Sequence, residues 1–282
     1  FRSESRKKVG SLLKLVHSIH CIETPDPVTA EVYELRIIRR LRPRYNFAGT
    51  RSEKYCYVRL TTEEEWPRLV IAKTAPTKGV ALGPMRTKGM ARDIVDAIES
   101  VLPLRRCTAR MGRNYVAPVD APVCSAARLG LAHCPCSGSA DPDTYAGVVD
   151  VVARTLRGDS DHVIELLTTR MANHSREERF EEAAFVRDRI DALRTALHRQ
   201  SQADELRQKD AYEVHGHGVT YRIEKGILTE TICDDNSCTP DSVNLPTAIG
   251  HLRESIRIPA GEPDTAVLDE VMCLARLVET LR

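Results

Sequence analysis

One carboxylate and five arginines lie close together in residues 34–46, ELRIIRRLRPRYN. Arginine pairs with phosphate oxygens through a planar fork, and an interleaved tyrosine or asparagine adds stacking and hydrogen bonds. A glutamate beside bound phosphate is also a typical Mg²⁺ ligand, with waters and phosphate oxygens completing the coordination shell. The stretch therefore contains the residue types of a metal-assisted phosphodiester site, although a solvated basic helix has the same composition.

The helical spacing predicts an unusual position for Glu34. The apolar residues that share its face are Ala30, Ile37, Ile38 and Leu41, and the arginines on the other side are Arg36, Arg39 and Arg40. A carboxylate on an apolar stripe is unfavourable unless something compensates its charge. Glu34 is then a metal ligand, a buried residue paired with another element, or a surface residue slightly out of phase.

Short elements are expected to position this stretch. A helix begins at Pro27 with Asp26 as its N-cap and ends at Pro43. An amphipathic helix is expected earlier, over residues 5–20. KYCYVRLTT and PRLVIAKT read as a strand hairpin, and a helix follows a Gly-Pro turn from Lys88 to Val101.

The cysteines suggest a second site. There are nine, an odd number without the dense spacing of a small disulfide scaffold, so reduced thiols or a metal site in the cytoplasm are expected. Residues 107–140 hold four of them among prolines and glycines with little periodicity. This segment is expected to be a loop that a ligand ties together.

The second half of the chain reads as helices followed by strands. Residues 141–157 and two helices within 160–200 are followed by QSQADELRQKD, which reads as a polar linker. An apolar seam on the last of these helices needs a partner, which is the preceding helix, another chain, or both: Ala183, Val186, Ile190, Leu193 and Leu197. From Ala211 strands alternate around a turn at Lys225-Gly226, and helices are expected near 245–256 and 264–281.

Charge is divided unevenly along the chain. Residues 1–113 carry 23 basic and 12 acidic side chains, 23 − 12 = +11, and the remainder carries 18 − 28 = −10. This favours a polyanion partner for the first half, or simply two solvated surfaces of opposite bias. No apolar run is long enough to span a membrane. Because the chain begins with Phe1 rather than Met, it is expected to be the interior of a longer protein.

Several motifs together resemble one family. AEVYELRIIRRLRPRYN, KYCYVRLTTEEEWPRLVIAK and LGPMRTKGMARDIVDAIESVLPLRRC resemble, in order, the N-terminal portion of UvrC-type (Cho-like) proteins, and RFEEAAFVRDRIDAL resembles their UVR hairpin. The resemblance implies a GIY-YIG nuclease domain in which Glu34 binds Mg²⁺ or Mn²⁺ and Asn46 belongs to the active site. It also implies a DNA surface formed by Arg36, Arg39, Arg40, Arg42, Arg44 and Tyr45.

The same resemblance implies further parts. The family's GIY and YIG tyrosines and a catalytic arginine precede the equivalent of Phe1, so the 282-residue chain alone is expected not to cut DNA, whereas its parent protein does. Cys107, Cys124, Cys134 and Cys136 fall where the family carries ligands suited to a 4Fe-4S cluster or zinc, with a shorter C-x-C and with His133 as an alternative ligand. The UVR hairpin implies docking to a UvrB-like partner through Phe180, Glu181, Ala184, Arg187 and Asp188.

These observations predict an α+β chain of four segments: a partial GIY-YIG domain (1–62), a hairpin, helix and four-cysteine segment (63–140), a helical region with the UVR hairpin (141–200), and a small C-terminal α+β domain (209–282). The predicted function is a cytoplasmic DNA repair endonuclease of nucleotide excision repair, with an SOS-response role. The end of the chain resembles the tail of a DEDD exonuclease–UvrC-like fusion. The alternatives are a non-catalytic DNA-binding and docking adaptor, and a UVR-containing regulator of a Clp-type protease.

Overall fold

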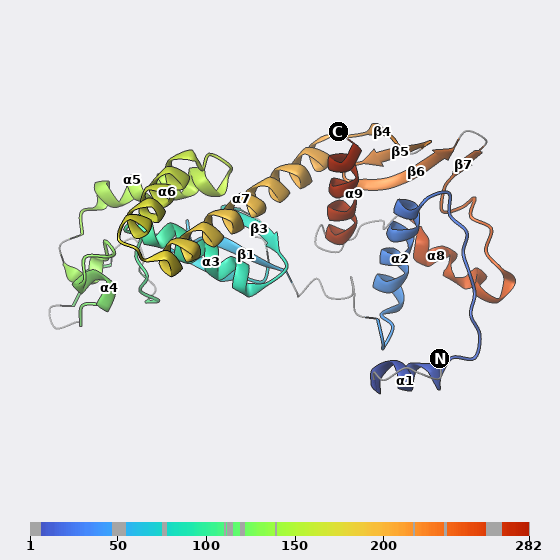
Figure 1. The fold of residues 1–282 in the computed structure, drawn as a ribbon, viewed down its shortest axis with the longest axis horizontal. Coiled ribbons are helices and arrows are strands. Elements are labelled where there is room, and N and C mark those ends of the chain that lie inside the picture. Colours follow the sequence, from blue (N-terminus) through green and yellow to red (C-terminus); the bar gives the residue numbers. More distant parts are fainter. Residues whose placement is uncertain are drawn as a thin grey trace. The chain divides into compact units, whose positions relative to one another are not determined.

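The computed structural model describes residues 7–46, 55–74, 78–109, 111, 115–118, 122–138, 140–216, 218–233, 236–257 and 267–281. The chain forms two compact units (Figure 1). One unit combines residues 1–52 with 202–282, and the other consists of residues 53–201. In the sequence, the unit of residues 53–201, called the central unit below, is therefore inserted between the two segments that form the other unit.

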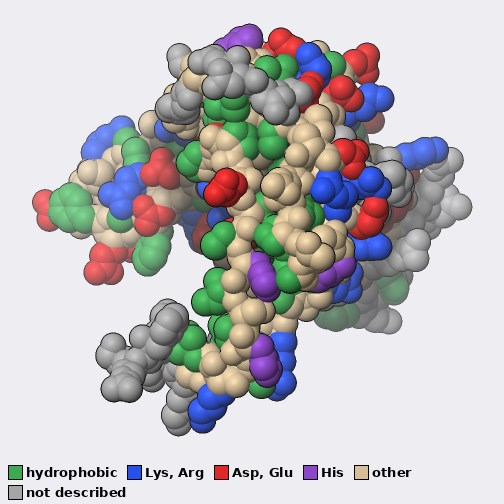
Figure 2. Space-filling view, turned by 90° about the vertical axis from the view of Figure 1, so that its right-hand side faces the viewer, with side chains coloured by type: hydrophobic (Ala, Val, Ile, Leu, Met, Phe, Trp, Pro, Cys, Tyr) green, Lys and Arg blue, Asp and Glu red, His purple; other side chains and the backbone are tan. Residues whose placement is uncertain are grey.

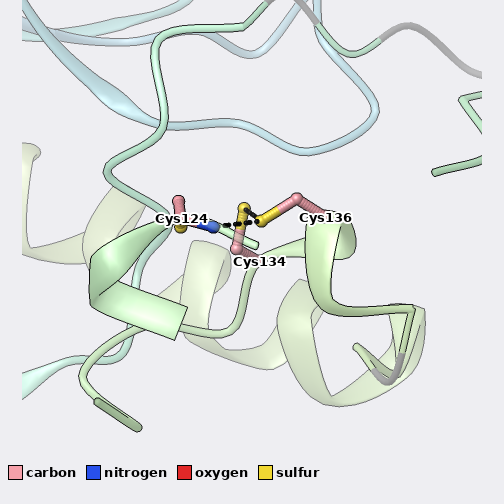
Figure 3. Close-up of side chains that lie close together, drawn as sticks. All are labelled: Cys124, Cys134 and Cys136. Carbon is pink, nitrogen blue, oxygen red and sulfur yellow. Dashed lines mark hydrogen bonds between the residues drawn. The ribbon is translucent and has the colours of Figure 1, made fainter. Parts of the chain in front are cut away.

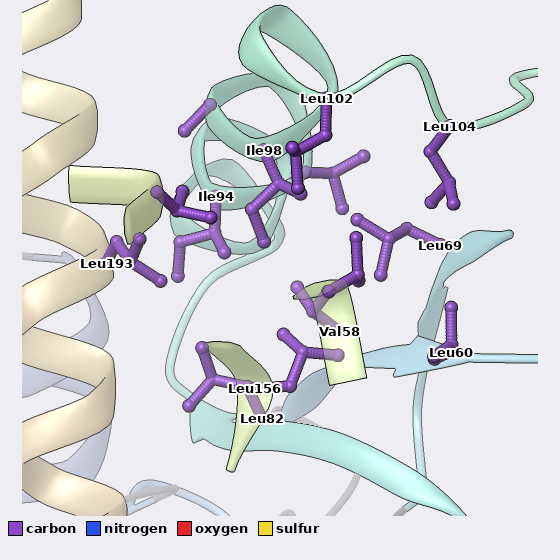
Figure 4. Packing of buried hydrophobic residues seen from close by; sticks show 14 of the residues in the cluster. Val58, Leu60, Leu69, Leu82, Ile94, Ile98, Leu102, Leu104, Leu156 and Leu193 are labelled. Atoms are coloured by element: carbon purple, nitrogen blue, oxygen red, sulfur yellow. The ribbon is translucent and has the colours of Figure 1, made fainter. Parts of the chain in front are cut away.

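The central unit begins with an antiparallel sheet of order β2-β1-β3. Its strands are β1 (Cys56–Leu60), β2 (Leu69–Ala72) and β3 (Val80–Met85). Helix α3 (Lys88–Val101) follows, capped by the Thr87 hydroxyl, which accepts a hydrogen bond from Met90 N. The buried face of α3 carries Ile94 and Ile98, which pack over Val58 and Leu82 of the sheet (Figure 4).

Helices complete this unit. They are α4 (Ser125–Arg128), the 3₁₀ turn η2 (Pro135–Ser137), α5 (Pro142–Leu156), α6 (Asp161–Arg176) and α7 (Phe180–Gln208). Asp141 caps α5 by accepting a hydrogen bond from Thr144 N at 2.8 Å. Val186, Ile190 and Leu193 of α7 are buried in the same core as α3, so the predicted seam closes against its own chain.

The other unit holds a four-stranded antiparallel sheet of order β4-β5-β6-β7. The strands are β4 (Tyr212–Gly216), β5 (Val219–Glu224), β6 (Ile227–Cys233) and β7 (Asn236–Cys238). Lys225 and Gly226 both have positive φ, 49° and 81°, as a two-residue I′ hairpin turn requires. The remaining elements are α1 (Lys7–Leu13), α2 (Pro27–Leu41), η3 (Thr247–Leu252), α8 (Arg253–Ile256) and α9 (Leu268–Leu281).

The α+β class and most elements agree with the sequence predictions, including α2, α3, α5 and the β1–β2 hairpin. Strand β3 was not predicted, because its Gly83-Pro84 reads as a turn, yet the pair lies inside the strand with a cis peptide. The helix predicted over 5–20 ends at Leu13. Leu15, Val16 and Ile19 are exposed, so no core holds them in a helix.

The predicted division into four segments was wrong at two places. The polar linker is helical, because α7 continues to Gln208 and buries Ala203 and Leu206 in the core of the first unit. The C-terminal segment is also no separate domain. It shares a core with α2, through Val32 and Tyr33, since contacts distant in sequence define the unit.

The charge asymmetry of the sequence does not produce a single-sign surface on the face shown in Figure 2. Basic and acidic side chains are interspersed there among the described residues. Several arginines of the basic half are paired with carboxylates, including Arg59 with Glu63 and Arg106 with Glu99. Among the described residues, no helix is both long and apolar enough to cross a membrane.

Candidate functional site

The rotation of α2 is set by a buried arginine. Arg36 is 1% exposed, and its guanidinium donates two hydrogen bonds to the Glu270 carboxylate, at 2.6 and 3.0 Å. It also donates to the carbonyl oxygens of Ile256 and Leu228, while Leu228 N donates to Glu270. Both charged groups thus have hydrogen-bond partners inside the core.

The N-terminus of α2 is anchored to the four-stranded sheet, on strands β5 and β6. The Asp26 carboxylate accepts hydrogen bonds from Val28 N and Thr29 N as the N-cap, and another from the Tyr221 hydroxyl of β5 at 3.0 Å. The Thr29 hydroxyl lies 2.9 Å from that of Thr231 on β6. With two anchor points a helical turn or more apart, α2 has one defined outward face.

The outward face is the one that carries Glu34. Glu34 is exposed, as are Ala30 and Leu41 of the stripe that was predicted to be buried. The predicted phase was therefore wrong in part: Ile38 of the predicted stripe is buried, but Thr29, Val32, Tyr33 and Arg36 point inward with it. Glu34 is the surface residue slightly out of phase that the sequence allowed as an alternative. The carboxylate that does lie on an apolar face is Glu270 of α9. It is 2% exposed, and its charge is compensated by Arg36.

This orientation separates the six residues predicted to contact DNA. Arg36 is wrongly placed in that set, because its guanidinium is fully engaged in the core. Arg40, Arg42 and Arg44 are exposed, and Arg39 and Tyr45 are half-buried. The Arg44 guanidinium lies 5.7 Å from the centre of the Tyr45 ring, a cation–π geometry.

The two residues predicted to be catalytic, Glu34 and Asn46, are both exposed. Glu34 lies in the middle of α2, and Asn46 follows the helix end, where Arg42 adopts the left-handed conformation and its N–H bonds Ile38 O at 2.8 Å. The C-terminal half of α2 and the residues that follow it thus expose one carboxylate and several cations to solvent.

Three of the four predicted cysteine ligands converge (Figure 3). The sulfur atoms of Cys124, Cys134 and Cys136 all lie within 4.8 Å of one another. Cys134 and Cys136 share a hydrogen bond of 3.1 Å, and Cys124 N donates to Cys136 Sγ at 3.5 Å. Cys107 lies outside this group, although it is close enough to influence the Cys136 thiol electrostatically.

The convergence has a local structural basis. Cys124 immediately precedes α4, while Cys134 and Cys136 flank Pro135 at the start of η2. Burial raises the pKa of the Cys134 thiol. Burial opposes ionisation of Cys136 too, but the Cys124 backbone N–H and the hydrogen bond with Cys134 lower the pKa of Cys136. A thiolate is the form that binds metal.

A second buried arginine, Arg105, lies two residues before Cys107 and holds the loop there, and no sequence pattern predicted its role. Arg105 is fully buried and donates to the carbonyl oxygens of Trp66, Cys107 and Ala109 and to the Glu64 carboxylate. The Tyr145 hydroxyl accepts a hydrogen bond from Arg105 N at 3.2 Å and donates one to Pro67 O at 2.5 Å. The available signal was a glutamate run, EEE, that precedes a tryptophan.

The UVR-like hairpin presents an apolar end. Phe180 and Phe185 of α7 are 66% and 64% exposed. Of the predicted partner-contacting residues, Phe180, Glu181, Arg187 and Asp188 are exposed, and Ala184 is half-buried. Arg187 and Asp188 bond to each other at 2.8 Å. The side chains expected to dock are accessible, whereas the inner seam is already filled.

Comparison with known families assigns the class. Residues 55–155 match the family model described as "UvrC/Cho excinuclease, middle domain", and residues 161–196 match the "UvrB/uvrC motif". The middle-domain match covers the sheet, α3, the cysteine segment and most of α5, and the motif match covers α6 and the first half of α7. The central unit is therefore built from these two parts.

The chain is homologous to proteins named UvrABC system protein C. It is 28% identical to that of Clostridioides difficile over 197 residues, 31% to that of Oleidesulfovibrio alaskensis over 195, and 29% to that of Chlorobium chlorochromatii over 234. These alignments cover 68%, 69% and 79% of this chain, but only 32%, 27% and 37% of the relatives. The chain thus spans about a third of their length, and no solved structure matches it.

Proposed function

We propose that this chain is the part of a UvrC-type endonuclease of nucleotide excision repair that supplies the metal ligand and docks on the partner protein. The observation that carries the proposal is the exposure of Glu34 on α2 and of Arg40, Arg42 and Arg44 at and just after the C-terminal end of the helix. The homology to UvrABC system protein C and the order of the matched parts support it.

In the proposed reaction Glu34 would hold one Mg²⁺ or Mn²⁺, which when bound would supply stabilisation of the charge that develops on the leaving 3′-oxygen. Arg40, Arg42 and Arg44 hold the DNA backbone and offset the charge of the transition state, and Asn46 contacts the reacting groups from the end of the helix. The buried pair of Arg36 and Glu270 keeps this face outward.

The cysteine segment is proposed to hold a 4Fe-4S cluster or a zinc ion. Cys124, Cys134 and Cys136 fit such a group because their sulfur atoms already converge in a largely buried site. Cys107 or His133 is the candidate fourth ligand. The bound group would order a segment that has few core residues of its own. Iron, acid-labile sulfide and zinc analysis of anaerobically purified protein tests this, with Cys134→Ser as the variant expected to lose the metal.

The UVR-like hairpin is proposed to dock on a UvrB-like helicase through its exposed end. Two exposed phenylalanines flanking a charged surface suit a hydrophobic contact with a polar rim. This docking would bring the chain to DNA that the partner has already engaged.

An incision assay on a damaged duplex tests the proposal, with the protein that carries this chain and Mg²⁺. Glu34→Gln is expected to reduce incision by about 10²-fold or more, because a metal supplies several kcal/mol of transition-state stabilisation. Glu31→Gln is the matched control. Glu31 is exposed three residues earlier on α2, where it pairs with Arg276 at 2.6 Å, and its loss should change the rate by less than about 3-fold.

Equal rates for the two variants would contradict the metal role of Glu34. If the protein binds damaged DNA and the partner yet never cuts, the non-catalytic adaptor is the better description. The exposed end of the hairpin favours that second function independently of α2.

A further inference from the structure

Four exposed cations gather at one end of the three-stranded sheet in the central unit. The last residues of β2 and β3 pair with the first two residues of β1, so these three strand ends lie side by side. Lys73 follows the end of β2, and Arg86 follows the end of β3. Because neighbouring strands are about 4.8 Å apart, the backbones at Lys73 and Arg86 are separated by roughly 10 Å.

Helix α3 adds two cations to this end of the sheet. Lys88 is the first residue of α3 and is close enough to Cys56, at the start of β1, to influence that thiol electrostatically. Arg92 lies one turn later on the same face of the helix. All four side chains are exposed. The sheet-end cations, as they are called below, are Lys73, Arg86, Lys88 and Arg92.

The charges of the sheet-end cations are not neutralised. No described carboxylate forms an ion pair with any of them, whereas Arg59 and Arg189 of the same unit pair with Glu63 and Asp96. Asp93 is the only carboxylate in the first two turns of α3, and it lies about 100° around the helix from the preceding residue. The described part of this sheet end is therefore positively charged and attracts an anion.

The start of α3 strengthens the positive potential. Its first turn contains no acidic residue and begins with Lys88, whereas acidic side chains occupy the first turns of α5, α6 and α7. The N-terminal end of a helix carries a partial positive charge, so Lys88 is repelled there and does not stabilise the helix. An exposed cation that opposes the stability of its own helix favours a role in binding.

The spacing of the sheet-end cations indicates the kind of anion. Charges that are spread over roughly 10 Å, on two strand ends and one helix face, match a row of anionic groups better than a single small anion. The phosphates of DNA form such a row, with one charge for about 3.4 Å along each strand. Arg86 and Arg92 also carry the planar fork that bonds two phosphate oxygens at once.

We propose that the sheet-end cations bind the phosphate backbone of DNA and give the central unit a DNA contact of its own. This contact is separate from the arginines of α2 and from the phenylalanines of the hairpin. It rests on the proposed function for the identity of the polyanion, but it requires neither a metal ion nor Glu34. Since it involves phosphates alone, it holds DNA without regard to base sequence.

DNA binding in the absence of divalent metal tests this surface without any contribution from incision. A short fluorescein-labelled duplex is titrated with the 282-residue protein, and its anisotropy is followed at a series of KCl concentrations. Each phosphate contact contributes about 0.9 to the slope of log K against log salt concentration. The variant Lys73→Gln/Arg86→Gln/Lys88→Gln/Arg92→Gln is expected to reduce that slope by about 2–4 and to weaken binding at least about 10-fold at low salt.

The control variant removes the same number of positive charges elsewhere in the central unit. Its four cations are also exposed and have no described carboxylate partner. One precedes β3 at the opposite end of the sheet, and the others lie on α4, after α5 and on α6. The control is Lys78→Gln/Arg128→Gln/Arg157→Gln/Arg170→Gln. It should change the slope by less than about 1.

Three results would overturn the proposal. These are an unchanged slope in the sheet-end variant, equal changes of slope in the two quadruple variants, or a poly-glutamate chain that binds the sheet-end cations as tightly as a duplex of equal charge. The last result would assign the surface to an acidic protein. An unaltered emission spectrum of Trp66, the only tryptophan in the chain, confirms that each variant is folded. Failure of this test leaves the incision test of Glu34 unaffected, because no metal is present in the binding measurement.

Discussion

Among the described residues, each unit of the molecule encloses one fully buried arginine, and the two arginines have different structural roles. Arg105 in the central unit bonds groups that lie 2 to 41 residues away along the chain. Arg36 in the other unit bonds groups 192 to 234 residues away. The first arginine shapes a loop, whereas the second joins the two ends of the chain into one core.

The difference shows how the same chemistry serves two purposes. Arg105 binds the backbone carbonyls of Trp66, Cys107 and Ala109, so it stabilises the loops that contain these residues. Arg36 binds a carboxylate on α9 in two places, so it specifies the rotation of a helix. In both cases the guanidinium satisfies carbonyl groups that burial would otherwise leave without partners.

Removing Arg36 is expected to have the largest effect. Arg36→Met leaves the buried Glu270 charge without a partner and should lower the free energy of unfolding by about 3–5 kcal/mol. The measurement is hydrogen exchange of the β5 and β6 amides in the native protein. The exposed Arg40→Met should stay within about 0.5 kcal/mol of the unaltered protein.

The double variant Arg36→Met/Glu270→Leu sharpens this result. Replacing both charges by apolar groups should restore much of the lost stability, because the desolvated pair itself contributes little net free energy. If the double variant were as unstable as Arg36→Met alone, Arg36 would stabilise the fold mainly through its hydrogen bonds to the carbonyl oxygens of Ile256 and Leu228.

Removing Arg105 should have a somewhat smaller effect, confined to the central unit. Glu64 retains about 10% side-chain exposure, so water can partly solvate its charge after Arg105→Met. We expect a loss of about 2–4 kcal/mol, measured by urea unfolding with Trp66 fluorescence, and faster alkylation of Cys107. Unchanged Cys107 reactivity would show that Arg105 does not order that segment. Arg128→Met, at an exposed position of α4 in the same unit, is the control.

Glu99 is a half-buried carboxylate whose arginine partner is more distant than that of Glu64 or Glu270. Its contact with Arg106 is 3.4 Å long, and burial raises the pKa of Glu99 to about 7 from an ordinary 4.5. The folded state therefore binds more protons than the unfolded state between these values, and stability falls as pH rises from 4.5 to 7.

Glu99→Gln should remove that pH dependence. Relative to the unaltered protein, the variant is expected to gain about 1 kcal/mol at pH 8 and nothing at pH 4. Urea unfolding at the two pH values measures the change. A variant equally destabilised at both pH values would indicate that the Glu99–Arg106 pair stabilises the fold despite its burial.

The smallest effect on stability is expected at the end of the hairpin. Phe180→Ser/Phe185→Ser should change the free energy of unfolding by less than about 0.5 kcal/mol, since both rings are mostly in solvent. The same variant should lose binding to a UvrB-like partner in a calorimetric titration. Full retention of binding would place the docking surface elsewhere.

Local sequence patterns predicted the elements of the fold well, and long-range contacts account for the failures. The Asp-Pro N-caps of α2 and α5 and the hairpin turn at Lys225-Gly226 are encoded within a few residues. The inward position of Arg36 depends on Glu270, which no window around α2 contains. For the same reason, the four-segment division missed that the C-terminal strands share a core with α2.

The candidate sites, too, could be predicted where their residues are close in sequence and not where they are distant. The cysteine cluster was predictable because a C-x-C pair and a nearby thiol are close in sequence, and three of the four predicted ligands converge. The contact between the buried Trp66 and Tyr145 rings was not, because the two residues are brought together only by the folded central unit. The exposure of Glu34 could be decided only once the buried partner of Arg36 was known.

The 234-residue separation of Arg36 and Glu270 has a consequence for synthesis of the protein on the ribosome. Residues 53–201 can fold as soon as they emerge, because their contacts are internal to that unit. Helix α2 has to wait for α9, almost the whole remaining length of the chain, before its arginine finds its partner. A chain shortened by proteolysis or early termination would keep a folded centre and leave α2 without its buried partner.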